Sequence, residues 1–138
     1  MTKTEALSDG RAATRLAVMG APLTLLRIEG AVALAASAWA YHQFGGNWAW
    51  FAGLLLLPDL AMLFYLAGPR IGAAAYNAAH TYLAPALMAL AGFVTDQPLW
   101  LLGALIWAAH IGMDRMLGYG LKYGSGFGDT HLGRKGKP

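Results

Sequence analysis

LWLLGALIWAAHIGMDRML, residues 99–117, decides the fold that the sequence predicts. The stretch is long enough to cross the hydrocarbon core of a membrane, which takes about 20 predominantly apolar residues in a helix. It nevertheless contains His110, Asp114 and Arg115 near its end. Charged side chains are expensive inside a bilayer, and they usually pair with one another or mark a functional site. We therefore expect other parts of the chain to supply partners for these three groups.

The composition places the chain in the membrane class. Of its 138 residues, 57% are hydrophobic and only 12% are charged, about half of the charged share of a typical soluble domain. A soluble helical bundle would need polar outer faces that these helices lack. The absence of cysteine excludes disulfide scaffolds and thiolate metal sites. The Lys and Arg residues form no compact stripe, so the net charge of +3 does not indicate a nucleic-acid partner.

Four segments are long and apolar enough to be membrane-spanning helices, and short Gly-, Pro-, Asn- and Asp-containing connections separate them. We expect an all-α fold, a four-helix transmembrane bundle with short loops over residues 23–117, whose spans are 23–44, 48–66, 71–93 and 99–117. A polar N-terminal segment, residues 1–22, precedes the bundle. A Gly-rich basic tail, residues 118–138, follows it.

The basic residues predict the orientation of the four spans. With four spans, both termini lie on the same side as the loop around Arg70, while the loops at Gly45 and Asp96 lie on the opposite side. All ten Lys and Arg residues fall on the side of the termini. By the positive-inside rule, we expect both termini to be cytoplasmic.

Polar residues of all four spans are predicted to meet at one depth. At a rise of 1.5 Å per residue, each span carries one of them about 10 Å from its cytoplasmic end. His80 lies one turn deeper and Asp114 one turn shallower. The strongly polar residues within the spans are Arg27, Glu29, Asp59, Asn77, His80, His110, Asp114 and Arg115. We expect them to form a polar layer near the cytoplasmic face.

Three interpretations of this layer are open. Ion pairs and hydrogen bonds between helices would hold the bundle together. Two histidines and three carboxylates on facing helices are also the ligand types of metal sites in bundles, and zinc, manganese or iron would suit Glu29, Asp59, His80, His110 and Asp114. Such an ion would activate water in a membrane-embedded hydrolase acting on a lipid-like substrate. As a proton relay, the same groups would serve a small proton-coupled transporter.

The tail has two interpretations as well. Its glycines disfavour a further helix, and its basic end would attract anionic lipid at the membrane surface. Alternatively, the tail is a lid that carries Asp129 and His131 toward the polar layer. Membrane lipid is the partner that the sequence predicts, and the small-residue faces of the first and third spans would also suit a homo-oligomer.

Two long motifs resemble a known family. PDLAMLFYLAGPRIGAAAYNAAHTYLAP and AAHIGMDRMLGYGLKYGSGFGDTHLGRKGK are similar to small bacterial integral membrane proteins catalogued as domain of unknown function 4260. The resemblance covers about Leu25 to Lys137 and implies a four-span protein of the bacterial inner membrane, with no assigned reaction. Its motif positions add Tyr76 to the polar layer. Phe64 stands where the resemblance implies a glycine.

Overall fold

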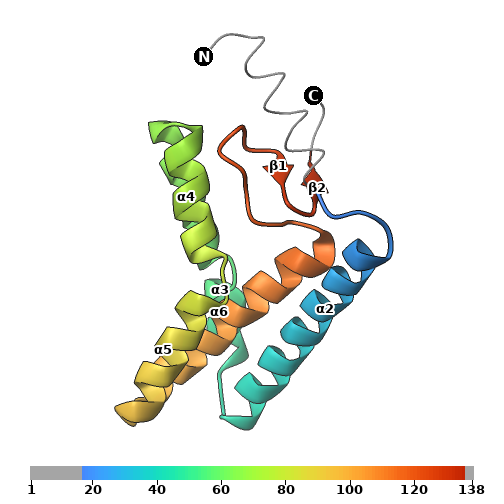
Figure 1. Ribbon diagram of the computed structural model, residues 1–138. Coiled ribbons are helices and arrows are strands. Elements are labelled where there is room, and N and C mark those ends of the chain that lie inside the picture. The colour runs from blue at the N-terminus through green and yellow to red at the C-terminus, as the bar shows by residue number, and fades with distance from the viewer. Residues whose placement is uncertain (1–16, 136–138) are drawn as a thin grey trace.

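The computed structural model describes residues 17–135, mostly as helices (Figure 1). In chain order, the elements are α2 (Gly20–Gln43), α3 (Trp48–Leu54), the 3-10 helix η1 (Leu57–Ala67), α4 (Pro69–Ala79), α5 (Leu83–Val94), α6 (Pro98–Leu117), and the strands β1 (Asp129–Thr130) and β2 (Gly133–Arg134). Most of the expected N-terminal segment lies outside the described residues. So do four of the basic residues that predict the orientation: Lys3, Arg11, Arg15 and Lys137.

Two of the four expected spans are single helices, and the other two are interrupted. Residues 23–44 and 99–117 correspond to α2 and α6, and each of these is a single helix. The second expected span is divided into α3 and η1, and the third into α4 and α5. A proline ring clashes with the carbonyl group four residues before it. Pro58 therefore ends α3 at Leu54, and Pro85 prevents a helix from running through Thr81.

Two helical segments of the described chain are long and apolar enough to cross a membrane, Gly20–Gln43 and Trp48–Ala67. Only 11% and 6% of their most apolar windows are buried in the structure, whereas the core helix of a soluble protein is mostly buried. Large apolar side chains such as Val32 on α2 and Leu60 and Phe64 on η1 are exposed. The number of spans and the side on which the termini lie stay predictions.

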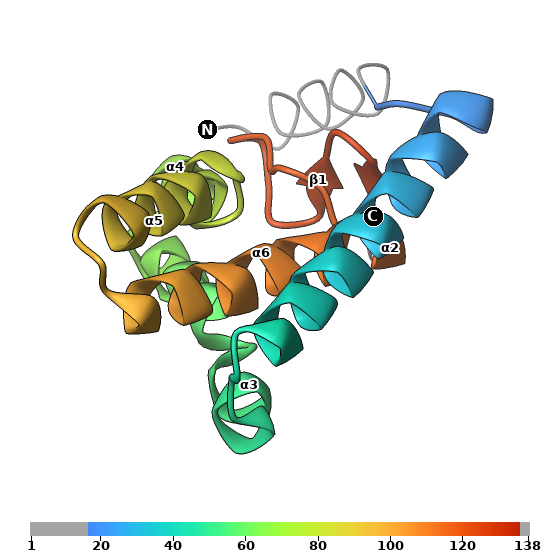
Figure 2. The same cartoon turned by 90° about the horizontal axis from the view of Figure 1, so that it is seen from below.

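Helix α6 is the centre of the arrangement. It packs against α2 on one side and against α5 on the other, as Figure 2 shows, while α4 packs on η1. The contact with α2 brings two backbones together at glycines. A Cβ atom on Gly30 would lie 2.6 Å from the Met116 nitrogen, and one on Gly112 would lie 2.6 Å from the Leu34 nitrogen. Such small-residue crossings are typical of membrane helices.

The tail folds back against the helices, between α4 and the start of α2 (Figure 1). Gly118 ends α6 in the left-handed conformation, with φ 83°, and residues 118–135 form no helix, as expected. Strands β1 and β2 pair as an antiparallel hairpin. Asn77 of α4 binds the tail backbone. Its amide donates to the Lys122 carbonyl at 2.8 Å and accepts from the Lys122 N–H at 2.7 Å.

Candidate metal centre

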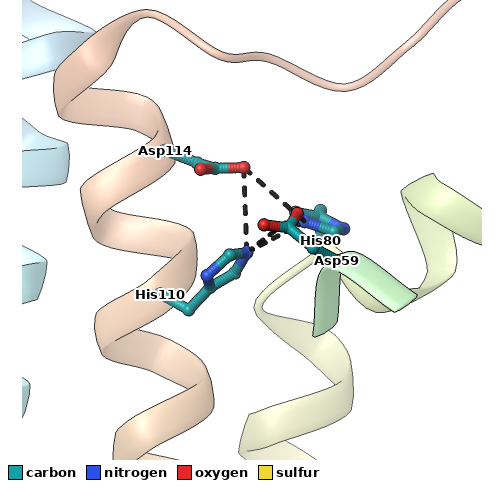
Figure 3. A group of neighbouring side chains, drawn as sticks. All are labelled: Asp59, His80, His110 and Asp114. Carbon is teal, nitrogen blue, oxygen red and sulfur yellow. Dashed lines mark hydrogen bonds and ion pairs between the residues drawn. The ribbon is translucent and has the colours of Figure 1, made fainter. Parts of the chain in front are cut away.

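Four side chains from three parts of the chain converge beside the break between α4 and α5 (Figure 3). Asp59 comes from η1, His80 directly follows α4, and His110 and Asp114 come from α6. One ligand atom of each residue lies within 4.8 Å of the corresponding atoms of the other three. We call these four residues the His/Asp cluster.

The helix break that carries His80 is fixed by side chains of α6. Ending α4 leaves backbone carbonyl groups without helical partners, and in an apolar environment such groups must be paired. The Trp107 indole N–H donates to the Ala79 carbonyl at 2.6 Å, and Arg115 Nη2 donates to the His80 carbonyl at 3.0 Å. His110 and Asp114 of α6 therefore enter the cluster. Trp107 and Arg115 of the same helix hold the chain break that places His80 there.

Tyr76 orients two members of the cluster. Its ring stacks on the His80 imidazole, with 3.6 Å between centroids and 10° between planes. Its hydroxyl group donates to Asp114 Oδ2 at 2.9 Å. Partners of this kind commonly orient metal ligands. The position that the family resemblance added to the polar layer thus supports the cluster directly.

The distances between the ligand atoms approach those of a tetrahedral metal site. His80 Nε2 lies 3.0 Å from His110 Nε2, 3.2 Å from Asp59 Oδ1 and 3.5 Å from Asp114 Oδ2. His110 Nε2 lies 3.5 Å from Asp59 Oδ1 and 3.9 Å from Asp114 Oδ2. Four ligands at about 2.0 to 2.1 Å from a tetrahedral ion would be separated from one another by about 3.3 to 3.4 Å. Shifts of a few tenths of an ångström would suffice for most of these pairs.

The protons available in the cluster do not satisfy its acceptor atoms. His80 Nδ1 lies 2.9 Å from the Tyr76 carbonyl, which can only accept a hydrogen bond, so Nδ1 carries the proton of neutral His80 and Nε2 presents a lone pair. That lone pair faces two carboxylate oxygens. A proton on His110 Nε2 can serve one of these acceptors at a time. A cation shared by the four atoms would satisfy all of them.

The cluster is buried on its histidine side and open on its carboxylate side. The side chains of His80 and His110 are 1% and 0% exposed, whereas those of Asp59 and Asp114 are 29% and 12% exposed. Both carboxylates line a cavity of about 410 Å³. Among residues 17–135, His110 Nδ1 has no hydrogen-bond partner, so within that part of the chain contacts at Nε2 and packing orient the ring. Ligands could reach the cluster through the cavity.

Glu29 does not join the cluster. It is exposed on α2 and lines a separate cavity of about 150 Å³ together with Arg115 and His131. Gly30, its neighbour, is the residue that faces α6. The His/Asp cluster therefore contains two of the three predicted carboxylate ligands, Asp59 and Asp114.

The remaining predicted polar residues bind backbone groups. Arg115 caps the His80 carbonyl, and Arg27 Nε donates to the Met116 carbonyl at 2.9 Å. Asn77 holds the tail through Lys122. None of the ion pairs among residues 17–135 involves either arginine. These residues thus stabilise chain ends and breaks.

Asp129 and His131 organise the tail and lie outside the cluster. Buried Asp129 accepts from the Ser125 hydroxyl at 2.8 Å and pairs with Arg134 Nε at 3.5 Å. His131 Nδ1 accepts from the Leu121 N–H at 2.8 Å. Burial, and then the charge of Arg115, lower the pKa of His131, so the neutral acceptor form is favoured.

Two residues outside the predicted polar layer shape the site. Lys122 is buried in the tail and lines the same cavity as Asp59 and Asp114. The signal for it was its position in the second motif of the family resemblance, residues 108–137. Trp107 caps the carbonyl before His80. It lies three residues before His110, one helical turn away, and this spacing was its signal.

The fold and the site define a mostly helical protein with outward-facing apolar helices and a buried group of two histidines and two aspartates that could hold a metal ion. The chain belongs to the family described as domain of unknown function (DUF4260), whose model matches residues 23–135. This match confirms the resemblance carried by the two sequence motifs. Searches of curated proteins and of solved structures gave no match.

Proposed function

We propose that this protein is a small integral membrane protein that binds one divalent metal ion in the His/Asp cluster. The observation that carries the proposal is the convergence of two imidazole nitrogens and two carboxylate oxygens within 4.8 Å of one another. The lone pairs of these atoms face one another with too few protons between them, so they repel one another. A divalent cation coordinated by all four atoms would remove that repulsion.

Exposed apolar surface supports the membrane part of the proposal. A monomeric soluble protein rarely exposes contiguous apolar patches larger than a few hundred Å². In this chain, two segments long enough to span a bilayer are exposed along most of their length. A multi-pass protein of the bacterial inner membrane, with cytoplasmic termini as the basic residues predict, would cover this surface with lipid.

Zinc is the ion that suits the cluster best among zinc, manganese and iron. The cluster offers four nitrogen and oxygen ligands and no sulfur, and Zn²⁺ accepts such ligands in tetrahedral geometry. Manganese favours an octahedral set rich in oxygen ligands, and non-haem iron commonly uses two histidines with one carboxylate and open positions. Four converging protein ligands fit zinc without further groups.

The cavity favours a catalytic use of the ion over a purely structural one, because closed structural sites need no access. The Asp114 oxygen is the ligand atom farthest from His110 Nε2, at 3.9 Å. It is therefore the ligand that water or substrate would replace most readily. Metal-assisted hydrolysis of a lipid-like substrate is the reaction class that follows.

Metal analysis of the purified chain tests the proposal. We expect about one zinc per chain in protein purified in mild detergent without a histidine tag, and loss of that zinc in the double variant His80→Ala/His110→Ala. The matched control is His42→Ala, because His42 stacks on Trp48 away from the cluster. Metal far below one ion per chain after zinc supplementation, with helicity intact, would contradict the proposal and leave a hydrogen-bonded network or a proton path. Stoichiometric zinc that survives the double variant would equally contradict it.

A further inference from the structure

The cavity beside the His/Asp cluster has walls of two kinds. Asp59 and Asp114 of the cluster line it, together with Tyr76, whose hydroxyl group donates to Asp114. The tail contributes Lys122 and Lys135 to the same lining. The volume of about 410 Å³ lies within the range of about 300 to 1,000 Å³ typical of small-molecule sites. The cavity is therefore large enough for a ligand that contacts both walls.

Lys122 is an unusual residue for this position. It is 8% exposed, and its ammonium group donates to the Phe127 carbonyl at 2.8 Å. It lies 3.6 Å from the Phe127 ring centroid and 4.6 Å from that of Tyr76. None of the ion pairs in the described chain includes it. An ammonium group has three donors, so the aromatic cage and one carbonyl leave capacity for an anion.

The cost of burying the Lys122 ammonium group also favours an anion in the cavity. Burial lowers the pKa of Lys122, while the charges of Asp114 and Asp59 oppose that shift. A buried ammonium is costly unless an anion compensates it, and cation–π contacts compensate only part of that cost. The two carboxylates are the nearest source of compensation, but in the proposed function they bind the metal ion.

Counting the charges of the cavity walls identifies the ligand class. Without metal, the two lysines and the two aspartates cancel. With a divalent ion in the cluster, the walls carry an excess of two positive charges in a partly buried space. A phosphate monoester carries close to two negative charges at neutral pH. Lysine binds phosphate as a point charge, and zinc accepts oxygen ligands.

We propose that this cavity binds the phosphate monoester group of a ligand between Lys122 and the metal ion. The inference rests on the metal site proposed above. Lys135 stands at the rim, where its ammonium donates to the Leu117 carbonyl at 3.1 Å and is exposed. Lys122 thus provides the buried contact and Lys135 an outer one. The shared chemistry includes an anionic lipid headgroup and a water-soluble phosphate ester.

Calorimetric titration of the full chain in detergent tests the proposal. The probes are inorganic phosphate, and phosphatidic acid in mixed micelles with phosphatidylcholine micelles as the reference. We expect zinc-loaded protein to bind phosphate saturably and EDTA-treated protein to bind it at least about tenfold more weakly. Phosphatidic acid that competes with phosphate would identify a lipid source. Phosphate binding without competition would identify a soluble one.

Variants distinguish phosphate binding in this cavity from a general effect of the protein's positive charge. Lys122→Met keeps the length of the side chain and its contact with the aromatic rings, and it should weaken phosphate binding at least about tenfold. Lys122→Arg should retain most of the binding. Arg70→Gln removes an exposed charge outside the cavity and should leave the affinity unchanged. Equal binding by Lys122→Met and the parent protein would overturn the proposal, as would the absence of phosphate binding by zinc-loaded protein.

Metal content measured on the same samples distinguishes the two proposals. A chain without zinc would contradict the metal site whatever the titration shows. A zinc-loaded chain that ignores phosphate would contradict only the cavity proposal. If Lys122→Met fails to fold, Lys135→Met provides the second reading, because the exposed Lys135 side chain lines the same cavity. A loss of affinity in Lys135→Met supports the site, and an unchanged affinity overturns it.

Discussion

His80 Nε2 and His110 Nε2 lie 3.0 Å apart, although 30 positions separate the two residues in the chain and both are buried. The hairpin of α5 and α6 returns the chain to the level at which α4 ends, and the helix break there turns His80 toward α6. Tyr76 holds the other ring nitrogen of His80 through its carbonyl group. The fold thus directs one lone pair of His80 at His110, Asp59 and Asp114, and the predictions below concern what holds this convergence together.

Tyr76→Phe tests the support of the cluster. The substitution removes the hydrogen bond to Asp114 but retains the stacking on His80. Loss of such a supporting partner typically lowers metal affinity by about 10- to 100-fold, and we expect this range for zinc in competition titrations with a chelator. Tyr65→Phe is the matched control, because the buried Tyr65 hydroxyl has no hydrogen-bond partner in the described part of the chain. Equal losses in both variants would show that the Asp114 contact is unimportant.

The sequence predicted α2 and α6, and four of its five candidate ligands meet in the His/Asp cluster, for physical reasons that are visible in the structure. An uninterrupted apolar run of helical length folds as one helix, and the depth of a residue follows from its count along the helix. His110 and Asp114 share a face of α6 because they are four residues apart. Asp59 and His80 lie close to them in the structure.

The sequence pattern did not predict how each helix is rotated about its axis or where the expected spans are interrupted. The close contact of Gly30 with Gly112 turns the neighbouring Glu29 outward, away from the cluster. The interruption at Thr81 follows from Pro85, because a proline ring clashes with the carbonyl group four residues before it. The continuous apolar pattern of residues 71–93 predicted one unbroken span instead. The pairing of Asn77 with the Lys122 backbone is a long-range contact without a local signal.

Gly112→Ala tests the crossing of α2 and α6. Its Cβ atom would lie 2.6 Å from the Leu34 nitrogen and 2.8 Å from the Gly30 carbonyl oxygen, so the helices must separate. We expect a loss of about 1 to 3 kcal/mol in the free energy of unfolding, the usual cost of overpacking. Gly53→Ala in α3, where a Cβ meets nothing within 4 Å, should be neutral or stabilising. Denaturation in mild detergent compares the two, and an unchanged Gly112→Ala protein would contradict the contact.

Cysteine labelling tests the predicted topology, because the chain has no cysteine of its own. Arg70→Cys places an exposed thiol in the first turn of α4, just after η1, and Thr95→Cys places one in the connection after α5. We expect a membrane-impermeant maleimide to label Thr95→Cys in intact cells, and Arg70→Cys only after the inner membrane is opened. Labelling of both in intact cells would rule out the four-span orientation. Labelling of Arg70→Cys alone would invert it.

The pH dependence of stability should report His131. Because burial and Arg115 lower its pKa in the folded state, the unfolded chain binds the proton more tightly. The free energy of unfolding should therefore fall as the pH drops below the unfolded value of about 6.5, by at most about 1.4 kcal/mol per pH unit for one group. Protonation also removes the acceptor for the Leu121 N–H.

His131→Gln isolates this contribution, since the glutamine carbonyl can still accept a hydrogen bond and does not titrate. The histidines of the cluster are present in both proteins, so their influence cancels in the difference between the parent chain and the variant. We expect the parent to lose stability relative to His131→Gln between about pH 7 and pH 5, with unfolding followed by circular dichroism in EDTA. Parallel curves over that range would show that His131 titrates alike in the folded and unfolded chains. A relative gain at low pH would mean that an anionic partner stabilises its charged form.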